Sequence, residues 1–146
     1  MATDNVINGT LCVLKTGAVL ASATPFAFST SASISLSMDT RDISNKGSAG
    51  WRQLLEAQMS WSASVEGLYA IQDASSVAVK NYDEMYDLLI SRVPTWLELT
   101  TAVTGDFSYN GEVYITSLEQ SAPMEDNMTF SASFEGTGIL NKLVNP

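Results

Sequence analysis

The chain lacks histidine altogether and is poor in several other residue types. Its 146 residues include one cysteine, four prolines, and seven lysines and arginines against sixteen aspartates and glutamates. Without histidine, the most usual general base and the commonest metal ligand are both missing. The lone Cys12 excludes an internal disulfide framework and a Cys-rich zinc site. The composition therefore predicts neither a metal nor a cofactor.

The acidic balance and the short apolar runs exclude further classes of partner. A formal net charge of −9 disfavours binding to phosphate backbones and to anionic lipid. No stretch approaches the ~18 apolar residues that a membrane span needs, so we expect no membrane insertion. Residues 11–23, LCVLKTGAVLASA, end like a signal-peptidase site, but Lys15 and Gly17 interrupt them and no basic region precedes them. A hairpin explains them better, with strands at 10–15 and 18–24 and a turn at Thr16-Gly17.

A period of two residues dominates the rest of the chain. In residues 26–39, FAFSTSASISLSMD, serine fills every odd position from 29 to 37 and mostly apolar residues fill the even ones. One octapeptide pattern occurs twice, as SWSASVEG at 60–67 and TFSASFEG at 129–136, and it alternates in the same way. Such alternation is typical of a strand with one buried face. We predict four long strands, at 26–39, 58–71, 112–121 and 127–138.

Local signals predict how these strands end, bend and connect. Leu118 breaks the alternation of 112–121, which indicates a bulge near Ser117. Gly67 and Gly136 follow the glutamates of the two octapeptides and suggest bends of the sheet. Asn110-Gly111 is a strong signal for a two-residue hairpin turn.

One helix is predicted at about 82–92. Asn81 can cap it, Glu84 completes a capping box, and Pro94 lies just past its end. Its apolar stripe consists of Tyr82, Met85, Tyr86 and Leu89. We expect this stripe to pack over one end or face of the sheet, with docking to a partner as the alternative.

A long connection, residues 40–57, is called the arm here. It carries three of the seven basic residues together with Gly47, Gly50 and an isolated Trp51. It is longer than compact domains usually tolerate without a function. Two interpretations are open: a flexible loop with Trp51 tucked onto the core, or a docking arm with Trp51 as its anchor.

The order of these segments resembles the major tail tube proteins of tailed bacteriophages, in the branch with long non-contractile tails. The resemblance runs from about residue 26 onward, and its strongest segments are 50–69 and 111–138. It rests on the serine-alternating strand, the Gly-rich arm, SWSASVEGLY, the acidic helix, NGEVYITSLE and the ending PMEDNMTFSASFEGTG. It implies that residues 1–146 form a single tail tube domain, all-β with one flanking helix. The implied fold is an antiparallel β-sandwich or half-barrel that joins neighbouring subunits into a closed β-barrel ring.

The same resemblance implies a structural, non-enzymatic role in the virion. Such proteins are made in the host bacterial cytoplasm and form stacked hexameric rings, which build the tail tube that conducts the genome into the host cell. The implied partners are other copies of the chain, a tape measure protein and tube-end proteins, and DNA passes without specific binding.

Two sets of site residues follow from this resemblance and from the alternation. The first, called the polar wall, is expected to face a water-filled lumen and consists of Ser31, Ser33, Ser35, Ser37, Ser62, Ser64, Glu66, Ser131, Ser133 and Glu135. The second belongs to the arm and is expected to contact a neighbouring subunit: Arg41, Asp42, Lys46, Trp51 and Arg52.

Rival functions remain open at this point. Glu66 and Glu135 could pair as the two carboxylates of a glycosidase, with Trp51 and Trp61 as sugar platforms. Strand alternation already explains both glutamates, so we expect no enzyme. A secreted glycan-binding or adhesive β-sandwich is the alternative function. A contractile-tail tube, a minor tail protein and a gene-transfer particle also fit the pattern.

Overall fold

The described part of the chain forms one antiparallel sheet with one α-helix. The computed structural model describes residues 9, 12–17, 23–25, 29–69, 82–101 and 103–146. The sheet order is β2-β1-β5-β6-β7-β4-β3, and every neighbouring pair is antiparallel. In chain order the elements are β1 (Cys12–Gly17), β2 (Thr24–Pro25), β3 (Ser29–Asp42), the 3₁₀ turn η3 (Lys46–Ser48), β4 (Leu54–Leu68), α1 (Tyr82–Ser91), β5 (Thr95–Thr101), β6 (Phe107–Ser121) and β7 (Thr129–Val144).

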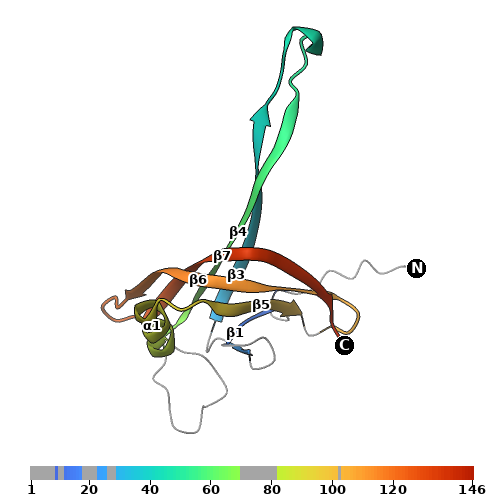
Figure 1. Cartoon of the computed structure of the whole chain (residues 1–146). Helices are drawn as coiled ribbons and strands as arrows, with labels where there is room; N and C mark the ends of the chain where they lie inside the picture. Colours follow the sequence, from blue (N-terminus) through green and yellow to red (C-terminus); the bar gives the residue numbers. More distant parts are fainter. Residues whose placement is uncertain (1–8, 10–11, 18–22, 26–28, 70–81, 102) are drawn as a thin grey trace, which may run out of the picture.

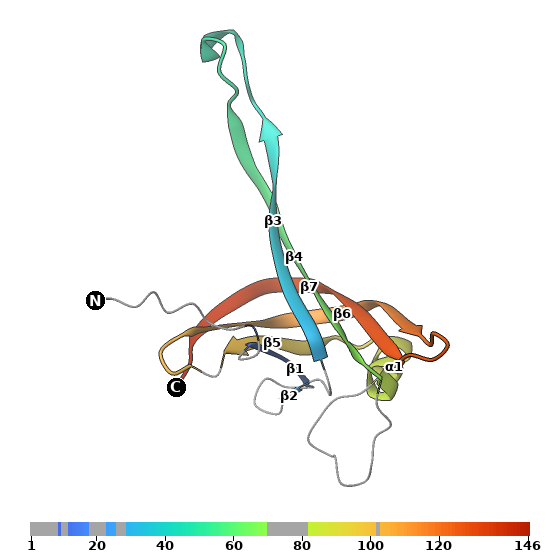
Figure 2. The ribbon, with the colours of Figure 1, turned by 180° about the vertical axis from the view of Figure 1, so that it is seen from behind.

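This architecture confirms the predicted all-β fold with one flanking helix. Among the described strands the sheet is open, because β2 and β3 are its two edges. The β3–β4 hairpin extends far beyond the rest of the molecule, which Figures 1 and 2 show from opposite sides. No helix among the described residues is long and apolar enough to cross a membrane.

The four predicted strands exist, but their bounds differ from those expected. The strand expected at 58–71 begins at Leu54, and the strand expected at 127–138 continues to Val144. The bulge expected near Ser117 is confirmed by a register shift between Ile115 and Ser117. Residues 26–28, 70–71 and the expected cap Asn81 lie outside the described residues.

Two predicted turns are wrong, because long-range pairing overrides the local signal. Thr16-Gly17 belongs to β1 and pairs with β5, and the Thr16 hydroxyl donates to the Trp96 carbonyl (3.0 Å). Residues 18–22, which include most of the strand expected at 18–24, lie outside the described residues. Asn110-Gly111 lies within β6, where Gly111 pairs with Leu97.

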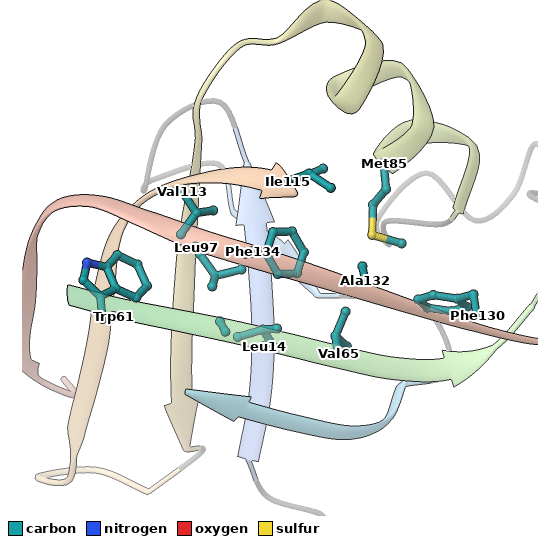
Figure 3. Packing of buried hydrophobic residues seen from close by; sticks show 11 residues of the cluster. Leu14, Trp61, Val65, Met85, Leu97, Val113, Ile115, Phe130, Ala132 and Phe134 are labelled. Atoms are coloured by element: carbon teal, nitrogen blue, oxygen red, sulfur yellow. The ribbon is translucent and has the colours of Figure 1, made fainter. Parts of the chain in front are cut away.

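The core lies against the apolar face of the sheet. Leu14 of β1 and Leu97 of β5 join Val65 of β4 and Phe134 of β7 in one buried cluster. Figure 3 shows Met85 pointing from α1 toward this cluster. The helix thus packs on the sheet through its predicted apolar stripe, although Tyr86 is exposed.

Trp61 of β4 is buried in a space that two glycines leave open. A Cβ added at Gly136 would overlap indole atoms of Trp61, and one added at Gly111 would lie 2.6 Å from Trp61 Cζ2. Next to this space β7 bulges, so that three residues, 138–140, lie opposite the single Gly111. The indole Nε1 donates to the Gly138 carbonyl at 3.2 Å. Gly111 and Gly136 are therefore required for room around Trp61.

We expect Gly136→Ala to destabilise the subunit by about 1–3 kcal/mol, because the added methyl overpacks a buried indole. Urea unfolding of the purified subunit measures this change, with the exposed Thr137→Ala as a control near zero. In the double variant Gly136→Ala/Trp61→Phe, the smaller ring relieves part of the clash. The losses of unfolding free energy in Gly136→Ala and in Trp61→Phe should then add to more than the loss in the double variant. Strict additivity would contradict this explanation.

Candidate functional site

The register brings all ten residues of the polar wall onto one face of β3, β4 and β7. Across the strands, Ser33 lies opposite Ser64, and Ser64 lies opposite Ser133. The neighbouring rows are Ser35–Ser62–Glu135 and Ser31–Glu66–Ser131. Pairs of serine hydroxyls link the edge strand β3 to β4, with Oγ–Oγ distances of 2.7 Å for Ser33–Ser64 and 2.9 Å for Ser37–Ser60. All ten side chains are exposed except Ser64 and Ser131, which are half-buried.

Strand β6 continues this face, which the sequence left unassigned. Ser117 lies opposite Ser133, Glu119 opposite Ser131, and Tyr114 opposite Glu135. The Ser131 hydroxyl also contacts Glu119 Oε2 at 3.4 Å. The bulge after Ile115 changes which residues of β6 share this face, so only an exact bulge position would have revealed Ser117 and Glu119.

The glycosidase interpretation does not fit the register. Glu66 pairs with Ser131 whereas Glu135 pairs with Ser62, so the two glutamates are offset by four residues along the strands. At ~3.3 Å per residue this offset is about 13 Å, whereas paired glycosidase carboxylates lie about 5–9.5 Å apart. Trp61 is buried in the core and cannot serve as a sugar platform. Within the described ranges, no cluster of three or more His, Cys, Asp or Glu could hold a metal ion.

The arm is the end of the β3–β4 hairpin, and its tip has a defined hydrogen-bonded shape. Strand pairing continues to Asp42 opposite Leu54, and the Ile43 amide donates to the Gln53 carbonyl (2.9 Å). At the tip, Asn45 and Ser48 form a capping box around η3. Trp51 does not pack on the core of its own chain, because its side chain is largely exposed.

The tip exposes large apolar groups beside positive charge. The side chain of Trp51 is 80% exposed, and Ile43 and Leu54 are also exposed. Arg52 Nε lies 3.3 Å from Asp42 Oδ2, while Arg41 and Lys46 are exposed without a salt bridge in the described structure.

Asp42 helps to fix the shape of the tip. Hydrogen bonds from Ser44, assisted by the charge of Arg52, lower the pKa of Asp42 below its usual value. Because the folded-state pKa is lowered, any stability from these contacts is present at neutral pH and is lost as the pH falls through that pKa.

These features favour one class of protein, a structural subunit that pairs with other copies of itself. The sheet has two open edges, its accessible face is polar, and its largest exposed aromatic side chain lies on a projecting hairpin. A family model of phage tail tube proteins matches residues 7–142. The chain therefore belongs to the phage tail tube protein family, and it is a structural protein of the virion tail.

Solved structures share this fold at low sequence identity. The virion of a native gene transfer agent particle contains a chain 18% identical, with a TM-score of 0.73 over 95% of this chain and all of that one. The tail of an empty gene transfer agent particle, with C6 symmetry, gives 19% identity and a TM-score of 0.73 over the same shares. The SPP1 tail tube gives 18% identity and a TM-score of 0.74 over 96% of this chain and 80% of that one. The search of curated proteins gave no match.

Proposed function

We propose that this chain acts as one tail tube domain over residues 1–146 and polymerises as stacked hexameric rings into a hollow tube that conducts the phage genome. The observation that carries the proposal is the polar face that crosses β3, β4, β7 and β6 opposite the apolar core. The family match supports a tube, and the six-fold symmetry of a gene transfer agent tail with the same fold supports hexamers.

The open sheet edges supply a reason for ring closure. Exposed edge strands present unpaired N–H and C=O groups, and closing a barrel removes them. Strand β3 is 14 residues long and forms one edge, while β1 and β2 form the other. Joining these edges between neighbouring subunits would complete a continuous barrel from six open sheets.

The polar wall is proposed to line the lumen of that barrel. Serine hydroxyls keep the surface hydrated, and the carboxylates of Glu66 and Glu135 repel phosphates. Lysines in the same places would bind the DNA backbone and release its counterions, which would slow its passage. If the other face of the sheet lined the lumen, Trp61, Val65 and Phe134 would lie in the channel, but these side chains are buried in the core.

The arm is proposed to bind a neighbouring subunit, with Trp51 as its anchor. A large aromatic residue at the end of a projecting hairpin is a typical interface hot spot. Arg41, Asp42, Lys46 and Arg52 belong to the same tip as Trp51 and would complete the contact with polar interactions.

The remaining partners follow from the proposed tube. We expect a tape measure protein inside it, other tail proteins at its two ends, and DNA passing through without specific binding. A structural role of this kind requires no catalysis. The alternative, a glycan-binding or adhesive module, is not favoured by the family match.

Electron microscopy of the purified subunit in negative stain tests the proposal. We expect rings or hollow tubes at high protein concentration, because both sheet edges and the arm need partners. A sample that stays a uniform ~16 kDa monomer through changes of concentration and salt would contradict it.

A further inference from the structure

The helix α1 has a second face that the core does not use. Asp83, Tyr86, Asp87 and Ile90 are spaced i, i+3, i+4 and i+7 and therefore share one side of the helix. All four are exposed, with Tyr86 at 51% and Ile90 at 63%, whereas Met85 on the opposite side is fully buried. We call these four residues the outer face of α1.

The outer face of α1 and the arm tip are complementary in charge and in polarity. Residues 41–53 of the tip carry three basic side chains against one acidic, a net charge of +2. The outer face of α1 carries two acidic side chains, Asp83 and Asp87, and no basic one, a net charge of −2. Each surface places its charges beside exposed apolar groups, Trp51 on the tip, and Tyr86 and Ile90 on the helix.

The two surfaces lie at opposite ends of the molecule. Both views show the tip at the far end of the β3–β4 hairpin and α1 beside the base of that hairpin (Figures 1 and 2). The tip therefore cannot reach the helix of its own chain. A contact between different surfaces of successive copies is heterologous, and it repeats along a polymer.

We propose that the outer face of α1 is the surface that receives the arm of the next copy of this chain. Trp51 packs on Tyr86 and Ile90, while Arg41 and Lys46 pair with Asp83 and Asp87. The inference rests on the proposed tube and deepens it by naming the surface that the arm binds. The charges select this surface and its orientation, and the apolar contact supplies most of the affinity.

Reciprocal charge reversal tests the pairing. Arg41→Glu/Lys46→Glu on the arm and Asp83→Lys/Asp87→Lys on the helix should each raise the critical concentration for polymerisation at least about tenfold. A chain with all four changes should return to within about threefold of the wild type, because the pairs are restored with opposite signs. Sedimentation measures the critical concentration, and circular dichroism confirms that each subunit is folded.

A matched control tests whether the rescue depends on the outer face of α1. Glu125→Lys/Asp126→Lys reverses two acids on the exposed turn before β7 and should not rescue the arm variant. If the wild type forms tubes and the fourfold variant is no better than the two double variants, the pairing is wrong while the tube stands. A wild type that forms no tubes would instead overturn the proposed function itself.

Cysteine crosslinking adds a direct test of direction. In a Cys12→Ser background, a chain with both Lys46→Cys and Asp87→Cys should give a ladder of covalent oligomers when polymer is oxidised. Neither single cysteine should give more than traces of dimer, because the contact joins two different surfaces. Polymer that forms without a ladder, or strong dimers from one cysteine alone, would overturn the proposal.

Discussion

Purified Trp51→Ala subunit is expected to remain folded and to form no tubes under conditions in which the wild type polymerises. The side chain of Trp51 is 80% exposed within the chain, and its backbone bond to Ser48 survives the substitution. Truncation of an interface hot spot costs at least ~2 kcal/mol, which raises the critical concentration about 30-fold or more. Sedimentation and electron microscopy measure assembly, and thermal unfolding of the subunit measures its stability.

Trp61→Ala is the matched control, because it removes the same side chain from a buried place. Trp61 is 5% exposed and donates to Gly138, so its loss should cost about 3–5 kcal/mol of the free energy of unfolding. The two variants thus separate assembly from stability. If Trp51→Ala lowered the unfolding temperature as much as Trp61→Ala does, Trp51 would belong to the subunit's own core.

The second large effect is expected in the polar wall. Glu66→Lys/Glu135→Lys should leave the subunit folded, because both side chains are exposed and lie on the face opposite the core. Assembled tubes should then bind DNA strongly at low salt and release it as salt rises, because ammonium groups displace counterions from the phosphates. Particles built from this variant should eject their genome more slowly.

Neutral substitutions provide the control for that experiment. Glu66→Gln/Glu135→Gln removes the repulsion without adding an attraction, so DNA retention should fall between that of the wild type and that of the lysine variant. Tubes with the lysine variant that neither retain DNA nor slow ejection would show that these residues do not face the lumen.

The polar face could be predicted from sequence because its signal is strictly local. Serine at alternate positions from 29 to 37, and again in both octapeptides, determines which side chains share a face whatever the strands pair with. The helix could be predicted from sequence for the same reason, because its apolar spacing and the following Pro94 are local signals too.

What could not be predicted depends on residues that are distant in sequence. The two wrong turns, Thr16-Gly17 and Asn110-Gly111, carry ordinary turn residues, but pairing with β5 keeps both in strands. Gly111 and Gly136 both leave space for the Trp61 indole. Neither glycine lies near Trp61 in the sequence, so this contact could not be predicted from local signals. The outer face of α1 was missed because Tyr86 was counted in the buried stripe.

The position of Trp61 also has a mechanical consequence. Pairing between β4 and β7 ends at Ser62 opposite Glu135, so beyond this point β4 pairs with β3 alone among the described strands. The hairpin is thus supported at one end only. There the Trp61 indole, which donates to the Gly138 carbonyl, connects the base of the hairpin to the bulge of β7. A two-stranded ribbon twists and bends more easily than a wide sheet. If the arm joins successive rings of the proposed tube, bending would be concentrated in these two-stranded ribbons, so a tail could flex while the bore within each ring kept its diameter.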